Sequence, residues 1–141
     1  MDSFIRDFSD PYFGKLYDGL RHDSGCPFRW GEKAIRMYQK MGVDPLNKTL
    51  VFSDSLNFPR MLEIWKQFKG RIKISFGIGT NLMNDVGNVP LDIVIKMVAA
   101  NGKPVAKISY DPGKSMCEDL GYLQYLASQY GIDPSIVKIS K

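Results

Sequence analysis

The stretch TLVFSDSLNFPRMLEIWKQFKGRIKISFGIG, residues 49–79, decides the fold because it contains a strand, a helix and another strand in succession. Its first run, TLVFSD (49–54), and its last, RIKISFGIG (71–79), carry the apolar and β-branched residues of short buried strands. A helix between two such strands is the crossover that joins parallel neighbours in a sheet. The stretch therefore predicts a βαβ unit.

The helix of this unit has recognisable ends. Asn57 fits the N-cap, Pro59 fits the first turn, and Gly70 fits the position after the last turn. Between these ends, the pattern predicts one apolar side that carries Met61, Leu62, Trp65 and Phe68.

The preceding residues repeat the order of strand and helix. YDGLRHDSG (17–25) predicts a short strand that runs into a polar loop, and GEKAIRMYQKMG (31–42) predicts a helix closed by Gly42. The buried side of that helix is predicted to carry Ala34, Ile35, Tyr38 and Met41. Strands that alternate with helices predict an α/β fold with a parallel sheet and right-handed crossovers.

The residues after the third strand predict a different arrangement. LDIVIKMVA (91–99) and PVAKISY (104–110) flank the pair Asn101-Gly102, which is typical of a two-residue hairpin turn. SMCEDLGYLQYLASQYG (115–131) predicts a helix whose core side carries Leu120, Leu123 and Leu126. The chain is thus predicted to hold three parallel βα units, an antiparallel hairpin and a C-terminal helix.

Length and charge limit the classes of function. The 141 residues have the length of one ordinary domain, and 44% of them are hydrophobic, which is enough to bury a core. The net charge of +4 comes from 19 Lys and Arg against 15 Asp and Glu, with no long basic run. Nucleic-acid-binding domains usually cluster their basic residues, so no nucleic-acid partner is predicted.

Cysteine usage and hydropathy indicate a compartment. Cys26 and Cys117 give neither a disulfide framework nor metal-ligand spacing, so free thiols in a reducing compartment and no metal site are expected. The N-terminal MDSFIRDFSD has no apolar core for export, and the apolar stretches are shorter than the ~20 residues of a membrane helix. The sequence predicts a cytoplasmic protein without a membrane partner.

Polar residues follow each predicted parallel strand, where ligands bind in such sheets. After the first strand, Arg21 and Asp23 should share one face of the strand end, with His22 on the other. The guanidinium suits a phosphate and the carboxylate suits ribose hydroxyls. The alternative is an ion pair that only closes the strand end.

The second loop offers a carboxylate. Asp54 stands between Ser53 and Ser55, just ahead of the helix that begins near Asn57. It is either a ligand residue or part of a helix-capping cluster.

The third loop offers backbone donors. Gly77 and Gly79 allow the backbone to approach a ligand closely, and the Thr80 hydroxyl and the following N–H groups suit an anion such as phosphate. The alternative is a tight turn that needs glycine for positive φ.

The three loops together are more specific than any one of them. GLRHDSG, TLVFSDSL, SFGIGT and LDIVIKMVAANGKPVAKISYDPGKSMCEDL, in this order, resemble the C-terminal part of bacterial nicotinate phosphoribosyltransferases. The resemblance covers nearly the entire chain. It implies an irregular βα barrel, with a separate domain built largely from the N-terminal part of the family's chain.

The resemblance also implies a reaction. Members of this family join nicotinate to phosphoribosyl pyrophosphate and release nicotinate mononucleotide and pyrophosphate, in the salvage route to NAD. They couple this transfer to ATP hydrolysis through a phosphorylated histidine. Magnesium is expected to accompany the pyrophosphate, held mostly by substrate oxygens and water, and no residue of this chain is readable as its ligand.

The family's site residues carry over position by position. The resemblance implies that Arg21 and Asp23 face the phosphoribosyl group, that Ser24 shapes the same loop, and that Asp54 and Ser55 line the pocket. It implies that the 5′-phosphate is received by the backbone of Gly77, Ile78, Gly79, Thr80 and Asn81. At Cys26 the family commonly has an acidic or amide residue, so this position departs from the pattern.

The catalytic histidine is expected outside the chain. His22 belongs to RHDSG, whereas the family's phosphorylated histidine lies in a segment upstream of everything present. The chain, residues 1–141, is interpreted as the C-terminal part of the barrel, without the N-terminal domain and the remaining barrel strands. A βα barrel needs about eight strands, so uncovered edges are expected to promote self-association.

Two explanations of the short length are open. Either the sequence is a fragment of the enzyme, and the isolated chain is inactive, or it is a short protein that binds a phosphoribosyl group or nucleotide without catalysis. A basic nucleic-acid-binding module is the third and least favoured alternative.

Overall fold

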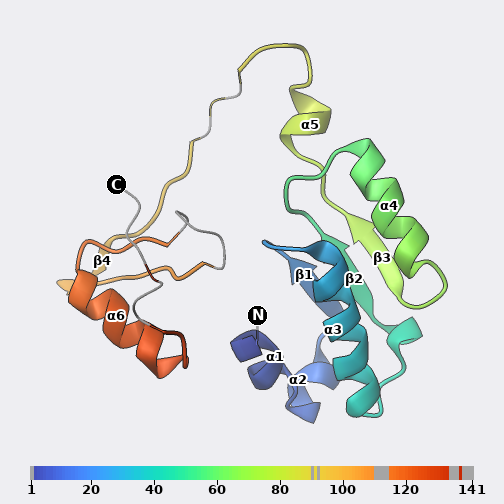
Figure 1. Ribbon diagram of the computed structural model, residues 1–141, viewed down its shortest axis with the longest axis horizontal. Coiled ribbons are helices and arrows are strands. Elements are labelled where there is room, and N and C mark those ends of the chain that lie inside the picture. Colours follow the sequence, from blue (N-terminus) through green and yellow to red (C-terminus); the bar gives the residue numbers. More distant parts are fainter. Residues whose placement is uncertain (1, 90, 92, 110–114, 134–136, 138–141) are drawn as a thin grey trace. The chain divides into compact units, whose positions relative to one another are not determined.

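The computed structural model describes residues 2–89, 91, 93–109, 115–133 and 137 (Figure 1). Its contacts divide the chain into two compact units, Met1–Pro90 and Leu91–Lys141. Within the described residues, no helix is long and apolar enough to cross a membrane.

The first unit is built on a three-stranded parallel sheet. Strands β1 (Gly19–His22), β2 (Thr49–Phe52) and β3 (Lys73–Phe76) lie side by side in chain order. The register is unshifted along the ladder, with Arg21 opposite Val51 and Val51 opposite Ser75. The predicted parallel sheet is confirmed, although each strand is shorter than its predicted range.

Helix α3 (Pro27–Lys40) follows β1 and begins earlier than expected because Pro27 occupies the first turn. It buries the predicted Ala34, Ile35 and Tyr38, and Met41 packs at the edge of the same core. The core also takes in the sheet and the next helix, and its large fully buried side chains include Tyr38, Phe52, Phe68, Leu50 and Ile64.

Helix α4 (Phe58–Phe68) begins after its predicted cap, since the Asn57 side chain accepts from the Arg60 N–H at 2.9 Å. The predicted apolar side is partly wrong. Ile64 and Phe68 are buried, whereas Leu62 and Trp65 are exposed, the latter by 45%. The helix turns a neighbouring stripe towards the core, where a Cβ on Gly31 of α3 would meet the Phe68 ring at 2.4 Å. Gly31 therefore permits the close approach of α3 and α4.

Two N-terminal helices were not expected from the sequence: α1 (Asp2–Phe8) and α2 (Pro11–Leu16). The Asp10 side chain caps α2 by accepting from the Tyr12 N–H. Buried Lys48, which follows the short 3-10 turn η1 (Pro45–Asn47), donates to the carbonyls of Lys15 and Tyr17 at 3.0 and 2.6 Å. This contact ties the end of α2 to the start of β2.

The second unit contains the predicted hairpin turn. Strands β4 (Ala99–Ala100) and β5 (Lys103–Pro104) pair antiparallel around Asn101 and Gly102, whose φ angles are 50° and 71°. Positive φ at both residues confirms the turn that this pair predicts. The strands are far shorter than the predicted 91–99 and 104–110, and residues 93–98 form no regular structure. Tyr110, the end of the second predicted strand, lies outside the described residues.

Helix α6 (Leu120–Gln129) closes the second unit. It begins at Leu120 instead of Ser115 because Asp119 caps it, accepting from the Tyr122 N–H at 2.9 Å. Leu123 is buried as predicted and Leu126 is half-buried, but Leu120 is 47% exposed, so its predicted place in the core is wrong. Among the residues that the structure describes, the small core of this unit consists of Cys117, Leu123, Ala127 and Val137.

Candidate functional site

The carboxyl ends of β1, β2 and β3 lie next to one another because the strands are parallel and adjacent. The three loops that follow them, residues 23–26, 53–57 and 77–79, carry the predicted site residues. The third loop leads into the short helix α5 (Thr80–Met83).

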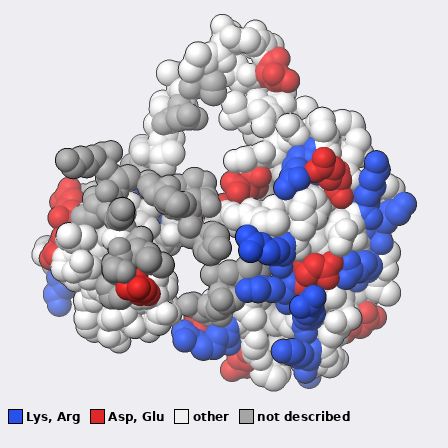
Figure 2. Space-filling view, in the orientation of Figure 1, with Lys and Arg blue, Asp and Glu red and all other residues white. Residues whose placement is uncertain are grey.

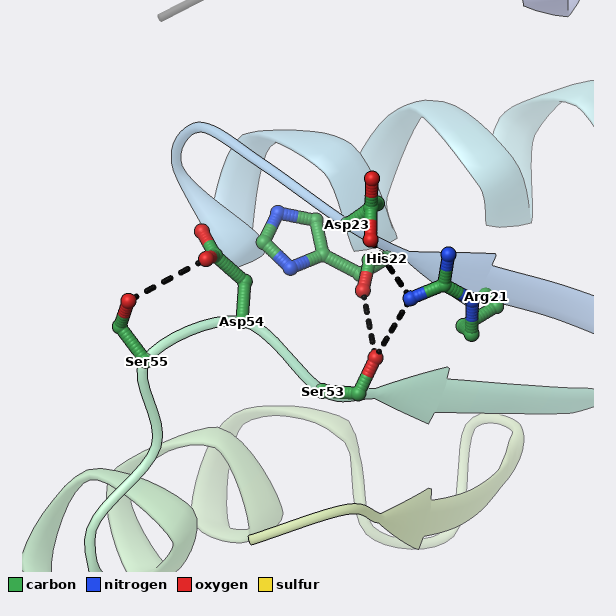
Figure 3. Close-up of polar contacts among 6 residues, drawn as sticks. All are labelled: Arg21, His22, Asp23, Ser53, Asp54 and Ser55. Carbon is green, nitrogen blue, oxygen red and sulfur yellow. Dashed lines mark hydrogen bonds and ion pairs between the residues drawn. The ribbon is translucent and has the colours of Figure 1, made fainter. Parts of the chain in front are cut away.

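The first strand end confirms the predicted alternation of side chains. Arg21 and Asp23 are exposed on one side, and His22 is buried on the other, only 1% exposed. Arg21 Nη1 lies 2.6 Å from Asp23 Oδ1, in an ion pair whose side chains are both more than half exposed (Figure 3). Such an exposed pair contributes little to stability, so both groups can turn to a ligand at small cost.

Ser53, which has no predicted role, joins the first two strand ends. Its hydroxyl accepts from Arg21 Nη1 at 3.0 Å and donates to the His22 carbonyl at 3.1 Å (Figure 3). The signal that could have identified it is its position: Ser53 directly follows Phe52, the last residue of β2, which pairs with His22 at the end of β1.

The second loop places Asp54 beside the buried His22 ring (Figure 3). Ser55 has a φ of 49° and donates its hydroxyl to Asp54 Oδ1 at 3.2 Å. The side chain that caps α4 is Asn57, as predicted, and Asp54 lies three residues ahead of it. The Asp54 carboxylate lies just beyond the end of β2, next to Ser55.

The third loop has room beside Gly79. Its φ is −92°, so the alternative of a turn that needs positive φ does not apply to it. A Cβ on Gly79 would meet no atom within 4 Å, counting the described residues. At Gly77 a Cβ would lie 3.2 Å from the Ser53 Cβ, and the Gly77 N–H already donates to the Phe52 carbonyl at 2.8 Å. Gly77 therefore contributes space for packing rather than a free donor.

The other members of this loop have divided roles. The Asn81 side chain donates to the Leu56 carbonyl at 2.9 Å, which ties the third loop to the second. The Ile78 side chain packs against the core, so only its backbone is available to a ligand. Thr80 begins α5, where the first N–H groups have no partner inside the helix.

Two side chains of the site have shifted pKa values. Burial lowers the pKa of His22, while the Asp54 and Asp23 carboxylates and the backbone of Ser24 and Gly25 act in the opposite direction. At the N-cap position of α3, the Arg29 N–H lowers the pKa of Cys26. A thiol at this departure from the family pattern thus meets the backbone donors of a helix start.

The charges of the site suit an anionic, hydroxyl-bearing ligand. One cation, two carboxylates and the N–H groups of the third loop gather at one end of the sheet. No group of three potential metal ligands occurs in the described part of the chain. On the face that Figure 2 presents, acidic side chains lie among the Lys and Arg, without a uniformly basic surface.

Known proteins are similar to this chain in sequence and in fold. The sequence model of the nicotinate phosphoribosyltransferase (NAPRTase) family matches residues 1–133. Nicotinate phosphoribosyltransferases of Psychromonas ingrahamii and Bordetella petrii are 87% and 59% identical over 100% and 96% of the chain, which spans 35% and 34% of their lengths.

Solved structures of nicotinate phosphoribosyltransferases show the same similarity. A crystal structure of nicotinate phosphoribosyltransferase from Vibrio cholerae matches 94% of the chain and 33% of its own, with a TM-score of 0.89 and 49% identity. The one from Porphyromonas gingivalis matches 93% of the chain and 35% of its own, with a TM-score of 0.82 and 43% identity. The chain spans about a third of the length of these relatives. It belongs to the nicotinate phosphoribosyltransferase family.

Proposed function

We propose that the chain supplies the phosphoribosyl-binding part of a nicotinate phosphoribosyltransferase. The reaction of the whole enzyme would join nicotinate to phosphoribosyl pyrophosphate, coupled to ATP, and release nicotinate mononucleotide and pyrophosphate. The observation that carries the proposal is the gathering of Arg21, Asp23, Asp54 and the open Gly79 turn at adjacent parallel strand ends.

Each group has a chemical task in this proposal. The exposed Asp23 and half-buried Asp54 carboxylates accept hydrogen bonds from ribose hydroxyls, and Arg21 binds anionic oxygens. Ser53 already orients Arg21, and Ser24 and Ser55 shape the adjoining loops. The N–H groups of residues 78–81 receive the 5′-phosphate, since Gly77 donates its own N–H to the sheet.

The arrangement suits glycosyl transfer. Positive charge develops at the anomeric carbon as pyrophosphate leaves, so carboxylates beside the ribose stabilise that charge. A fixed 5′-phosphate orients the sugar for attack by nicotinate. ATP and magnesium remain expectations for the whole enzyme. The described residues show no cluster that fits a metal ion, so no step of the reaction is assigned to one.

The parallel sheet is proposed to be part of an irregular barrel, with residues 1–141 forming its C-terminal part. In the described residues, β1 and β3 each pair on one side only, which fits strands whose other neighbours lie in the remaining two thirds of the relatives. We therefore expect the purified 141-residue chain to produce no nicotinate mononucleotide. Turnover by this chain would contradict the proposal and would show that the catalytic groups lie within it.

The phosphate site is tested by substitution of Gly79. Calorimetry would measure the binding of ribose 5-phosphate to the wild-type chain and to G79A and G79V. Both variants should bind at least about tenfold more weakly, because the new side chain fills the space of the phosphate. The control L82A changes an exposed residue of α5 and should bind normally.

Two further measurements distinguish loss of the phosphate site from loss of the fold. The thermal unfolding midpoint of G79A should stay close to that of the wild type, because the added Cβ meets open space. D23N should weaken ribose 5-phosphate binding while leaving inorganic phosphate binding unchanged. Wild-type affinity in folded G79V would remove the third loop from the site.

A further inference from the structure

His22 is the most enclosed ionisable side chain of the strand-end site. Its ring is 1% exposed, between the polar residues Arg21 and Asp23 in the chain but on the opposite side of the strand. It is also the only histidine in the sequence. None of the roles proposed above uses it.

The ring is packed among aromatic side chains from two other elements. Trp30 of α3 meets it edge to face, with centroids 5.3 Å apart, and Phe52 of β2 lies at 5.9 Å. Neither ring nitrogen makes a hydrogen bond of normal geometry to any residue that the structure describes. A buried polar group without a partner is costly, and a phenyl ring would fill this space without that cost.

The groups around the His22 ring are aromatic or acidic. Helix α3 and strand β2 present the apolar rings of Trp30 and Phe52, and the charged groups that act on the imidazole are the carboxylates of Asp54 and Asp23. Asp23 is engaged by Arg21 at 2.6 Å. Asp54 is held on one side by the Ser55 hydroxyl, and Figure 3 shows the imidazole beside it.

We propose that His22 is a positioning residue for Asp54: a ring nitrogen donates to the Asp54 carboxylate in the ligand-bound site and turns it towards the ribose hydroxyls. This inference rests on the proposed function, because it assigns the ribose contact to Asp54. Its geometric basis is the buried imidazole beside Asp54, whose ring nitrogens make no hydrogen bond of normal geometry in the described residues. The hydrogen bond from the Ser53 hydroxyl to the His22 carbonyl links the ends of β1 and β2.

The first experiment needs no ligand. In the full 141-residue chain, the ring signals of the sole histidine can be followed by NMR against pH. D54N should lower the pKa of His22 and shift its ring nitrogen signals, because the neighbouring negative charge is lost. D85N, at an exposed position of the same unit, is the matched control. Unchanged ring signals in D54N would overturn the proposal.

The second experiment uses ribose 5-phosphate. H22F keeps an aromatic ring against Trp30 and Phe52 but has no donor, and we expect about tenfold weaker binding of ribose 5-phosphate with unchanged affinity for inorganic phosphate. H22Q keeps a side-chain N–H and should recover part of the loss. A purely structural role would weaken both ligands together or would give no rescue by glutamine, and either result overturns the proposal.

The two proposals fail in different ways. If the folded wild-type chain binds no ribose 5-phosphate, the proposed function of the site is contradicted, and the effect of D54N on His22 still decides whether the two side chains are coupled. If H22F does not fold, H22Q and the D54N titration decide the matter.

Discussion

The two compact units of the chain differ in how completely they bury their apolar residues. The first unit packs two helices and a parallel sheet around a core with several large buried side chains. In its described residues, the second has two-residue strands, one helix and a core of four buried residues. Its residues 93–98 expose their apolar side chains, and Ile95 is 93% exposed. The candidate site is therefore positioned by the first unit, which has the larger core.

The largest expected effect is on the core of the first unit. F68A removes a fully buried ring that packs on Gly31 and Phe52, and should lower the free energy of unfolding by about 3–5 kcal/mol. Buried Trp30 makes tryptophan fluorescence a probe of this unit. F58A, at the exposed start of the same helix, should change stability by less than about 0.5 kcal/mol. Equal losses for both variants would refute the assigned core.

Helix capping allows a direct comparison of the units. Asn57 and Asp119 each accept from a backbone N–H at 2.9 Å, at the starts of α4 and α6. N57A and D119A should each lower the stability of the capped helix by about 1 kcal/mol. Amide hydrogen exchange would measure this as lost protection in that helix. We expect D119A to expose α6 more completely, because its unit has the smaller core. Greater loss of protection in α4 would reverse the comparison.

An ion pair gives the first unit a dependence on pH. Arg71 binds both carboxylate oxygens of Glu32 at 2.6 and 2.9 Å, and its hydrogen bonds lower the pKa of Glu32 from 4.5 to about 2. Because the folded pKa is lowered, the stabilisation is present above about pH 4.5 and is lost as the pH falls towards 2. E32Q should cost about 1 kcal/mol at neutral pH, since the pair is partly exposed.

The control for this pair is E63Q, which removes the exposed partner of Arg60 within α4. It should cost at most about 0.5 kcal/mol. Urea unfolding of both variants at neutral and acid pH measures the difference. If the wild-type chain and E32Q kept a constant gap in stability down to pH 2, the assigned cause of the acid dependence would be wrong.

The smallest effect on stability is expected in the exposed apolar residues of the second unit. I95S should change the free energy of unfolding by less than about 0.5 kcal/mol, since the side chain is almost fully exposed. The same change should reduce self-association in sedimentation experiments, because exposed apolar surface favours association. Unchanged association in I95S would assign any self-association to another surface, such as the sheet edges.

Local signals predicted much of the fold. The alternation of β1, α3, β2, α4 and β3, the Asn57 cap and the Asn101-Gly102 turn depend on residues close in sequence, and all were confirmed. The predictions of the apolar side of α4 and of long hairpin strands were partly wrong, because burial and strand pairing depend on distant partners. α1 and α2 were missed because they bury few apolar residues, although Asp10 before a proline is a capping signal.

The candidate site shows the same division. Strand alternation predicted that Arg21 and Asp23 share one face, and the structure confirms it. The links made by Ser53 to Arg21 and by Asn81 to Leu56 join residues far apart in the sequence, so they become visible only when the strands are aligned. The roles of the glycine turn in phosphate binding and of Asp23 and Asp54 in ribose binding remain predictions.

The central claim is that the loops at the carboxyl ends of β1, β2 and β3 bind a phosphorylated ribose. Amide NMR of the 141-residue chain during titration with ribose 5-phosphate tests it most directly. We predict saturable shifts that are largest at the N–H groups of residues 78–81 and extend to Asp23 and Asp54. Saturable shifts confined to other parts of the chain, or no shifts at millimolar ligand, would contradict the account.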